Sequence, residues 1–306
     1  MKAIQYIAFG DSTVLRLNEV TKPIVQDDEV LVRIASTTVN PFDMKVRSGS
    51  MQKMLNIELP YTPGSDIAGV VEAIGNKVMR IKVGDEVFGT TFGGTYAEYI
   101  SIKESQITVK PRNVSLNEAV SLAVPMVTAY TLLLEAAQLQ SGQRVLVHGA
   151  AGSVGSVMVQ MAKAIGAYVI ATASGEGVDL VKGVGADEVI DYKKTDFTTV
   201  AKNIDLVADT VEGETQTKSF TVLKKGGKLI SLVSQPSAEL AKKHEVIVQY
   251  LNSTPSFKKL DFGSQLVDQG KIKPHIAKTM KLEQAAAAQD LVSAGGVNGK
   301  VVLEVS

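Results

Sequence analysis

The 306-residue sequence contains no cysteine, and its 32 basic residues are balanced by 32 acidic ones. The lack of cysteine excludes disulfides, a thiolate nucleophile and zinc sites with cysteine ligands. The balanced charge offers no excess of basic residues for nucleic acids or acidic membranes, so neither is expected as a partner. None of the three histidines lies at ligand spacing from another, so no metal site is expected. They are His148, His244 and His275.

No apolar run is long enough to predict a membrane span. The most apolar stretch, residues 119–134, is interrupted by Ser121, Pro125 and Thr128 and falls short of the ~20 residues that a span requires. The opening segment MKAIQYIAFG is too short and mixed for a signal peptide and predicts a first strand. With 45% apolar and 21% charged residues, we expect a soluble, cytoplasmic, enzyme-like chain with room for two domains.

The pattern of apolar residues changes near residue 115. Before it, short strands separated by Gly and Pro predict a β-rich domain; they are expected at 3–7, 29–37, 67–74 and 95–100. After it, a helix over 116–137 leads into alternating strands and helices, which predict a parallel sheet covered on both faces. These later strands are expected at 168–173, 188–190, 204–208, 228–233 and 245–250.

Beyond residue 250 the alternation stops. Two helices, at 256–269 and 282–294, precede a final strand at 300–305 that is expected to return to the first domain. The sequence therefore predicts a discontinuous catalytic domain, residues 1–117 and 251–306, around a nucleotide-binding domain, residues 118–250. The active site is expected in the cleft between the two domains.

A glycine-rich turn separates a strand from a helix in residues 145–167, VLVHGAAGSVGSVMVQMAKAIGA. Gly149, Gly152 and Gly155 are spaced three apart, and apolar residues then recur on one face of the helix. Those residues are Val154, Val157, Met158, Met161 and Ile165. A strand, a tight glycine turn and a helix N-terminus together hold a dinucleotide pyrophosphate. The spacing alone also fits an ordinary strand–helix turn, but the second strand directly after the helix favours dinucleotide binding.

The residue that ends the second strand of such a unit recognises the 2′ position of the ribose. Here it is Ser174, with no acid, and Tyr192 ends the next strand, so we expect NADPH rather than NADH. Glu176 is the opposing candidate, because an acid accepts hydrogen bonds from the ribose hydroxyls of NADH. Lys182 is either a phosphate ligand or a solvated helix lysine, and His148, beside the glycine turn, is expected to be a packing residue.

Taken in order, the motifs of this chain resemble those of the zinc-independent quinone oxidoreductase branch of the medium-chain dehydrogenase/reductase superfamily, over nearly the whole length. The segments that carry the resemblance are VNPFDMKVRSG (39–49), PYTPGSDIAGVVEAIG (60–75), GDEVFG (84–89), GGTYAEY (93–99), VHGAAGSVG (147–155) and GKVVLEV (299–305). The resemblance implies an α/β fold with a GroES-like β-rich catalytic domain and a Rossmann domain with a doubly wound parallel sheet.

The zinc-binding members of the superfamily carry a Cys where this chain has Asp43, and Gly-His-Glu where it has Gly-Ser-Asp at 64–66. The resemblance therefore implies an enzyme without zinc. A quinone or activated enone accepts hydride without a Lewis acid, so we predict an NADPH:quinone reductase with a small quinone or enone acceptor. A 2-alkenal or enone double-bond reductase and a non-catalytic NADPH-binding sensor are the alternatives. Met51 stands where related enoyl thioester reductases have a tyrosine, which argues against that activity.

The resemblance places Asn40, Asp43 and Lys45 in a loop that faces the nicotinamide. Asn40 is expected to bond the substrate or the nicotinamide ribose, and Lys45 to stabilise an oxyanion or deliver a proton, steered by Asp43. The alternative is a surface turn opened by Asn-Pro, in which Asp43 bonds its own backbone. Tyr61 either lines the acceptor pocket or is a core aromatic, and Asp66 is expected to have a structural hydrogen-bonding role.

The resemblance also assigns the remaining cofactor contacts. Thr128 is expected near the nicotinamide ribose, Ser153, Val154 and Gly155 at the pyrophosphate, and Val211, Leu232, Val233 and Ser234 at strand ends toward the nicotinamide. Lys300 is either a pyrophosphate ligand or a surface lysine at a strand end. Dimers are common in this family, and the expected edge strand at 245–250 provides a surface for a homodimer.

Overall fold

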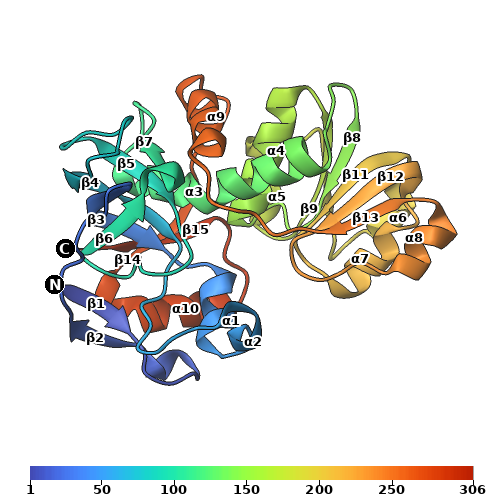
Figure 1. The fold of residues 1–306 in the computed structure, drawn as a ribbon. Coiled ribbons are helices and arrows are strands. Elements are labelled where there is room, and N and C mark those ends of the chain that lie inside the picture. Colours follow the sequence, from blue (N-terminus) through green and yellow to red (C-terminus); the bar gives the residue numbers. More distant parts are fainter. Residues whose placement is uncertain (306) are drawn as a thin grey trace. The chain divides into compact units, whose positions relative to one another are not determined.

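The computed structural model describes residues 1–305, which form two compact units (Figure 1). The first unit contains Met1–Val124, Pro255–Gln265 and Pro274–Ser306, and the second contains Pro125–Thr254 and Leu266–Lys273. The second unit is thus inserted within the discontinuous first unit, and the expected domain bounds, 1–117 with 251–306 around 118–250, stay a prediction. Residues 266–273 belong to the second unit although they follow the return to the first.

The first unit is built on a mostly antiparallel seven-stranded sheet, ordered β14-β15-β3-β4-β5-β7, with β6 also paired to β3. Its strands are β3 (Glu29–Thr38), β4 (Asp66–Ile74), β5 (Glu86–Thr90), β6 (Tyr99–Lys103), β7 (Ile107–Val109), β14 (Ile276–Lys281) and β15 (Lys300–Glu304). A two-stranded sheet joins β1 (Lys2–Gln5) and β2 (Arg16–Glu19). The α-helices are α1 (Pro41–Arg47), α2 (Gln52–Leu55), the start of α9 (Phe257–Asp268), and α10 (Ala285–Ser293).

Two apolar clusters form the core of the first unit. One lies under the sheet and is rich in β-branched residues such as Val32, Ile67 and Val87, all fully buried. The other gathers around α10 and includes Tyr96 and Leu303. The sheet is therefore held by burial on its own strands and by a helix from the far end of the sequence.

The strand expected at 95–100 is shifted, because β6 begins only at Tyr99. Tyr96 donates its N–H to the carbonyl of Pro63, and its own carbonyl accepts the N–H of Ile4. These bonds tie the segment to β1 and to the loop before β4, ahead of the point where it joins the ladder. The expectation was wrong here because the competing partners are distant in sequence.

The second unit contains a six-stranded parallel sheet ordered β10-β9-β8-β11-β12-β13. Its strands are β8 (Arg144–Val147), β9 (Tyr168–Ala173), β10 (Glu188–Asp191), β11 (Ile204–Asp209), β12 (Leu223–Ser231) and β13 (Ile247–Tyr250). Its helices are α3 (Leu116–Tyr130, shared with the first unit), α4 (Ser153–Ile165), α5 (Gly177–Gly183), α6 (Phe197–Val200), α7 (Gly213–Ser219) and α8 (Ala238–His244). The chain runs outward from β8 to β10 and then from β11 to β13, which is the doubly wound order of dinucleotide-binding domains. The expected fold class is confirmed.

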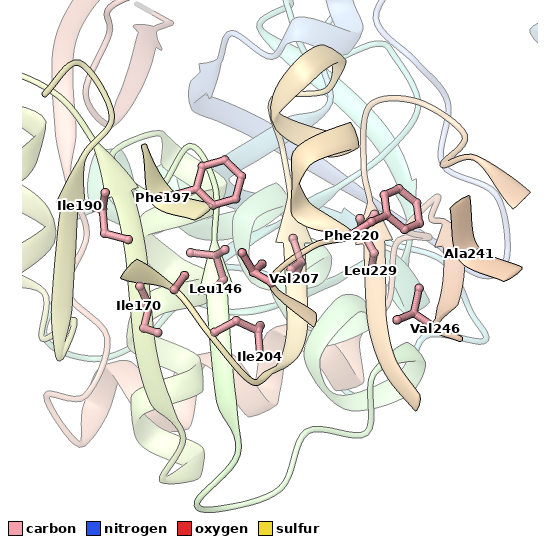
Figure 2. Packing of buried hydrophobic residues seen from close by; sticks show 12 residues of the cluster. Leu146, Ile170, Ile190, Phe197, Ile204, Val207, Phe220, Leu229, Ala241 and Val246 are labelled. Carbon is pink, nitrogen blue, oxygen red and sulfur yellow. The ribbon is translucent and has the colours of Figure 1, made fainter. Parts of the chain in front are cut away.

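The core of this unit surrounds Leu146 and Val207, which lie on the two central strands β8 and β11 (Figure 2). Phe197 and Phe220 cover these strands from the segments that follow β10 and β11, and each is at most 6% exposed. The central helix α4 is buried from Gly155 to Ala162, around more of its circumference than the single expected face. The turn that precedes α4 is therefore fixed to the middle of the sheet.

One helical stretch, Leu116–Ala136, is long and apolar enough to cross a membrane by length and composition. It consists of α3 and a π-helical turn, Thr131–Ala136. Of its most apolar window, 72% is buried inside the structure. This stretch is therefore a core helix.

Candidate active site

The glycine turn between β8 and α4 has the backbone geometry of an anion site. Gly149 has a φ of +67°, and a Cβ at Gly155 would stand 2.3 Å from the carbonyl oxygen of Gly149. Neither position admits a side chain without a shift. Among the described residues, the N–H groups of Ser153, Val154 and Gly155 at the start of α4 have no acceptor. These donors and the positive end of the helix fit a phosphate group.

Most residues expected to contact the cofactor lie at the carboxyl ends of the parallel strands. The glycine turn follows β8, Ser174 follows β9, Tyr192 follows β10, Val211 follows β11, and Leu232, Val233 and Ser234 follow β12. Open parallel sheets bind ligands along this edge, at the point where the strand order reverses. Thr128 lies on α3, where its hydroxyl is 3.2 Å from that of Ser253.

Ser174 and Tyr192 come together at this edge. The Ser174 hydroxyl donates a 2.8 Å hydrogen bond to the Tyr192 hydroxyl, and the Tyr192 side chain is 57% exposed. Glu176 is exposed at the start of α5, in the loop after Ser174. Lys182 is exposed in the last turn of α5, at the end of that helix away from the loop. The structure thus joins the two hydroxyls and gives Lys182 no contact with either.

A buried carboxylate fixes the strand ends on the other side of the turn. Asp209, fully buried at the end of β11, accepts the N–H of Val211 at 3.0 Å and the hydroxyl of Ser231 at 2.8 Å. It also accepts the amide of Gln216 at 2.9 Å, and that amide is 3.1 Å from the Ser234 hydroxyl. The network ties the loops after β11 and β12 into one arrangement. Its members are polar residues at strand ends, but the sequence did not show that they meet.

His148 links three elements behind the glycine turn. Its Nδ1 is 3.0 Å from the Thr172 hydroxyl on β9, and its Nε2 is 3.0 Å from the Ser219 hydroxyl on α7. The ring packs edge-on against Phe197, with 4.7 Å between ring centroids. Burial lowers the pKa of His148 to about 4, partly opposed by the charge of Asp209, so the ring is neutral at pH 7. The expectation of a packing residue is confirmed.

In the first unit, a buried ion pair lies where β15 meets the loop after β3. The Lys300 ammonium is 3.2 Å from the Asp66 carboxylate and donates to Asn40 Oδ1 at 2.6 Å. Asn40 in turn donates its Nδ2 to Asp66 at 2.8 Å. The Val124 N–H, at 2.6 Å, and the Thr38 hydroxyl complete the partners of Asp66. The polar side chains of the cluster are at most 5% exposed, and the bonds given above pair each of them.

The cluster contradicts one of the two alternatives for Lys300, which is not a surface lysine, while its role as a pyrophosphate ligand stays a prediction. The side chain is 2% exposed, and its charge is used by Asp66 and Asn40. Both amide atoms of Asn40 are likewise committed, so this residue orients its neighbours. The structural role expected for Asp66 is confirmed.

Asp43 points into the first unit from the first turn of α1. It accepts the N–H of Asn40 at 2.8 Å and the Ser65 hydroxyl at 3.3 Å, and it is 2% exposed. Burial raises the pKa of Asp43 to about 7 against the opposing bond from Asn40; the charge of Asp66 raises it further. The bond from Asn40 shows that Asp43 does bond the backbone of the Asn-Pro turn, but the carboxylate is buried and not part of the surface turn that the alternative expected.

Lys45 lies two residues further along α1 and is exposed. Residues two apart on a helix do not face each other, so Asp43 does not steer the Lys45 ammonium. The expected Asp43–Lys45 pairing is therefore wrong. Lys45 remains an exposed cation on the surface of the first unit.

Tyr61 was expected either to line the acceptor pocket or to be a core aromatic, and its ring and its hydroxyl lie in different surroundings. Its ring packs 5.5 Å from that of Tyr6, while its hydroxyl is 3.5 Å from the carbonyl oxygen of Phe92 in an exposed region. Burial raises the pKa of Tyr61 to about 12, helped by the charge of Asp43, so the hydroxyl stays protonated at neutral pH. It is a neutral hydrogen-bond donor.

Comparison with known proteins agrees with this arrangement. Residues 26–112 match the model of the alcohol dehydrogenase GroES-like domain, and residues 184–303 match a model described as zinc-binding dehydrogenase. The chain is 33% identical over 324 residues to quinone oxidoreductase from Mus musculus, with 99% of this chain and 97% of that protein covered. It belongs to the quinone oxidoreductase branch of the medium-chain dehydrogenase/reductase superfamily.

Two further similarities extend this assignment of the branch. A 2-methylene-furan-3-one reductase from Solanum lycopersicum is 35% identical over 321 residues, with 99% of this chain and 79% of that protein covered. The structure of the quinone oxidoreductase from Coxiella burnetii superposes with a TM-score of 0.92 at 32% identity, covering 100% of this chain and 99% of the other. The chain is therefore an oxidoreductase of this branch with a small-molecule acceptor.

The name of one matching model raises the question of whether zinc fits here. Zinc in proteins is held by thiolates, imidazoles and carboxylates. The Asp66 carboxylate already carries the Lys300 ammonium, whose charge repels a cation, and Asp43 is buried with its pKa raised to about 7. Within residues 1–305, no three His, Asp or Glu side chains are grouped to hold a metal ion. The residues at these positions do not fit zinc.

Proposed function

We propose that this chain is an NADPH-dependent, zinc-independent quinone oxidoreductase. The observation that carries the proposal is the carboxyl edge of the second unit. There the unbonded N–H groups of α4 follow β8, and the Ser174–Tyr192 hydroxyl pair follows the next two strands, β9 and β10. That spacing along one edge suits a dinucleotide whose pyrophosphate lies at α4 and whose adenosine ribose lies at β9. The relatives named quinone oxidoreductase support the acceptor class.

The residues of the second unit divide the binding between them. The N–H groups of Ser153, Val154 and Gly155 bind the pyrophosphate, and Ser174 and Tyr192 donate hydroxyls to the 2′-phosphate. Val211 and Ser234, held in place through Asp209, line the nicotinamide end, with Leu232, Val233 and Thr128. When bound, NADPH supplies the hydride at C4 of the nicotinamide.

The first unit supplies groups for the acceptor. Reduction of a quinone or enone carbonyl adds one hydride and needs one proton at an oxygen atom. Tyr61, as a neutral hydroxyl, and Lys45, as an exposed ammonium, are the donors proposed for that oxygen. Asn40 and Asp43 hold the start of α1, the helix that carries Lys45, in place through their buried bonds.

An enone double-bond reductase is the second candidate, and the tomato relative named 2-methylene-furan-3-one reductase favours it. A panel of 1,4-naphthoquinones, phenanthrenequinone and 2-alkenals with NADPH separates the two candidates. Turnover of quinones alone supports the leading proposal, and turnover of alkenals alone supports the second. If no acceptor is turned over while NADPH fluorescence shows binding, both catalytic proposals are refuted and a non-catalytic NADPH-binding sensor remains.

Cofactor preference has its own test. In Ser174→Asp, a carboxylate repels the 2′-phosphate and accepts the ribose hydroxyls of NADH, so the ratio of kcat/KM for NADPH over NADH should fall at least tenfold. Thr221→Asp, which places the same charge at an exposed position outside this edge, should leave the ratio unchanged. An unchanged ratio in Ser174→Asp would contradict the assignment of this residue to the 2′ position.

The proposed enzyme is a homodimer in the cytoplasm. β13 lies at one edge of the sheet of the second unit, and Ile247 on that strand is 56% exposed. An exposed edge strand can pair with a second copy across a two-fold axis. The cytoplasmic location stays a prediction from composition.

A further inference from the structure

The turn after β10 carries two adjacent lysines in different surroundings. Lys194 is 3.0 Å from the Asp191 carboxylate and is thereby paired. Lys193 is exposed, and within the described chain its ammonium has no carboxylate within 4.0 Å and no hydrogen-bond acceptor. Its backbone N–H, by contrast, is anchored to Asp191 at 3.1 Å. The turn is therefore fixed, while one of its two cations is unused.

This turn borders the place assigned to the 2′-phosphate. The Tyr192 N–H donates to the carbonyl of Ala173 at 3.1 Å, which continues the β9–β10 ladder by one step and brings Tyr192 beside Ser174. Lys193 is the next residue. A Cβ on Gly175, the residue after Ser174, would meet no heavy atom within 4 Å, so the loop itself is uncrowded at that position.

The charge of Lys193 already acts on this turn. Its positive charge adds to the stronger effect of the Lys194 hydrogen bond in lowering the pKa of Asp191. Among the described residues, however, the carboxylate of Asp191 forms its ion pair with Lys194 and not with Lys193. A lysine on a flexible four-carbon stem can reach a phosphate that binds nearby.

We propose that Lys193 is the cationic ligand of the 2′-phosphate and completes the site formed by Ser174 and Tyr192. This inference rests on the proposed use of NADPH. A phosphate with about two negative charges, held by two neutral hydroxyls alone, lacks a charged partner, and charge-assisted bonds are about twice as strong as neutral ones. Lys182, the basic residue expected from the sequence, lies at the far end of α5 from the loop. Glu176, exposed in that loop, opposes the phosphate, so Lys193 also offsets an unfavourable charge.

The test is Lys193→Gln in the full chain, with Lys194→Gln as the matched control in the same turn. Dissociation constants for NADPH and NADH are measured by the fluorescence of the bound nicotinamide, and those for 2′,5′-ADP and 5′-AMP by calorimetry. Lys193→Gln should weaken NADPH and 2′,5′-ADP at least tenfold, equivalent to about 1.4 kcal/mol. It should leave NADH and 5′-AMP within twofold, and Lys194→Gln should leave all four within twofold.

The outcomes distinguish this inference from the proposed function. If the unaltered chain prefers NADPH and Lys193→Gln keeps that preference, the role of Lys193 is refuted while the cofactor assignment stands. A loss of preference in Lys182→Gln instead would assign the role to Lys182 and likewise refute the inference. If the unaltered chain binds NADPH and NADH equally, both the inference and the use of NADPH are refuted. A weaker dependence of NADPH binding on salt in Lys193→Gln supports the loss of one charge contact.

Discussion

Asp43 gives the first unit a stability that should fall as pH rises. Burial raises the pKa of Asp43 from 3.8 to about 7 in the folded chain. Between about pH 4 and pH 7 the folded chain holds a proton that the unfolded chain has released, so the free energy of unfolding decreases with pH in this window. Below pH 4 both states are protonated and the contribution is fully present, whereas above pH 7 both are ionised and it is lost. A shift of about 3 units at 1.36 kcal/mol each corresponds to about 4 kcal/mol.

The perturbation that isolates this effect is Asp43→Asn. The asparagine is neutral at every pH, and its carbonyl oxygen can accept the Asn40 N–H that Asp43 now accepts at 2.8 Å. The difference in unfolding free energy, variant minus unaltered chain, should therefore rise by about 4 kcal/mol between pH 4 and pH 8. Asp27→Asn is the control, because that carboxylate is 56% exposed in a surface ion pair and should give a nearly constant difference.

His148 makes the difference measurement necessary. Burial lowers its pKa from 6.5 to about 4, so between those values the unfolded chain holds the extra proton and stability increases with pH. The expected size, about 2.5 units at 1.36 kcal/mol, is about 3 kcal/mol and opposes the contribution of Asp43. In the unaltered chain the two contributions nearly cancel, so its free energy of unfolding would change little with pH on their account. The contribution of each group becomes visible only when a variant is compared with the unaltered chain.

The assay is urea unfolding at pH 4 to 8 and constant ionic strength, followed by circular dichroism. If the two units unfold in separate transitions, the effect of Asp43→Asn should appear in the transition of the unit that contains Met1–Val124. A difference between Asp43→Asn and the unaltered chain that stays constant within 1 kcal/mol from pH 4 to 8, or that falls, would refute the assignment of a raised pKa to this carboxyl.

Three further changes test other parts of the structure. Lys300→Met leaves the buried Asp66 carboxylate without its cation and should lower the free energy of unfolding by about 3–5 kcal/mol in urea; a loss under 1 kcal/mol would contradict the pairing. Gly155→Ala forces a Cβ to 2.3 Å from a backbone oxygen and should abolish nucleotide binding, measured by fluorescence, whereas Gly183→Ala, which faces open space, should leave it intact. Ile247→Lys places a charge on the exposed edge strand and should convert the proposed dimer to a monomer in sedimentation equilibrium with unchanged nucleotide affinity; an unchanged dimer would assign the interface elsewhere.

The sequence predicted the second unit well because its signals are local. The glycine turn lies between a short apolar strand and a helix, and parallel strands place their carboxyl ends at one edge. Ser174 and Tyr192 could therefore be expected to meet, although they are 18 residues apart. Lys193 was missed because only the ion pairs of the folded turn distinguish it from Lys194.

The first unit was harder to predict because its polar contacts join distant segments. Lys300 and Asn40 are 260 residues apart in the sequence, and nothing in either motif indicates that they bond. The Asp43–Lys45 pairing failed for a local reason, since the 3.6-residue period of α1 turns the two side chains to different faces. Buried ion pairs of this kind depend on the fold and become visible only in it.

The Lys300–Asp66 pair also supports the kind of acceptor proposed for this chain. A divalent cation at Asp66 would have to displace an ammonium that is 2% exposed and bonded to Asn40, leaving a buried lysine without its carboxylate. The cluster therefore favours chemistry in which the charge that develops after hydride transfer is delocalised over the acceptor itself, as in a quinone or an enone. Under the proposed function, such an acceptor would be reduced by a positioned nicotinamide with a neutral proton donor, the role proposed for Tyr61, and would not need a metal-bound oxygen.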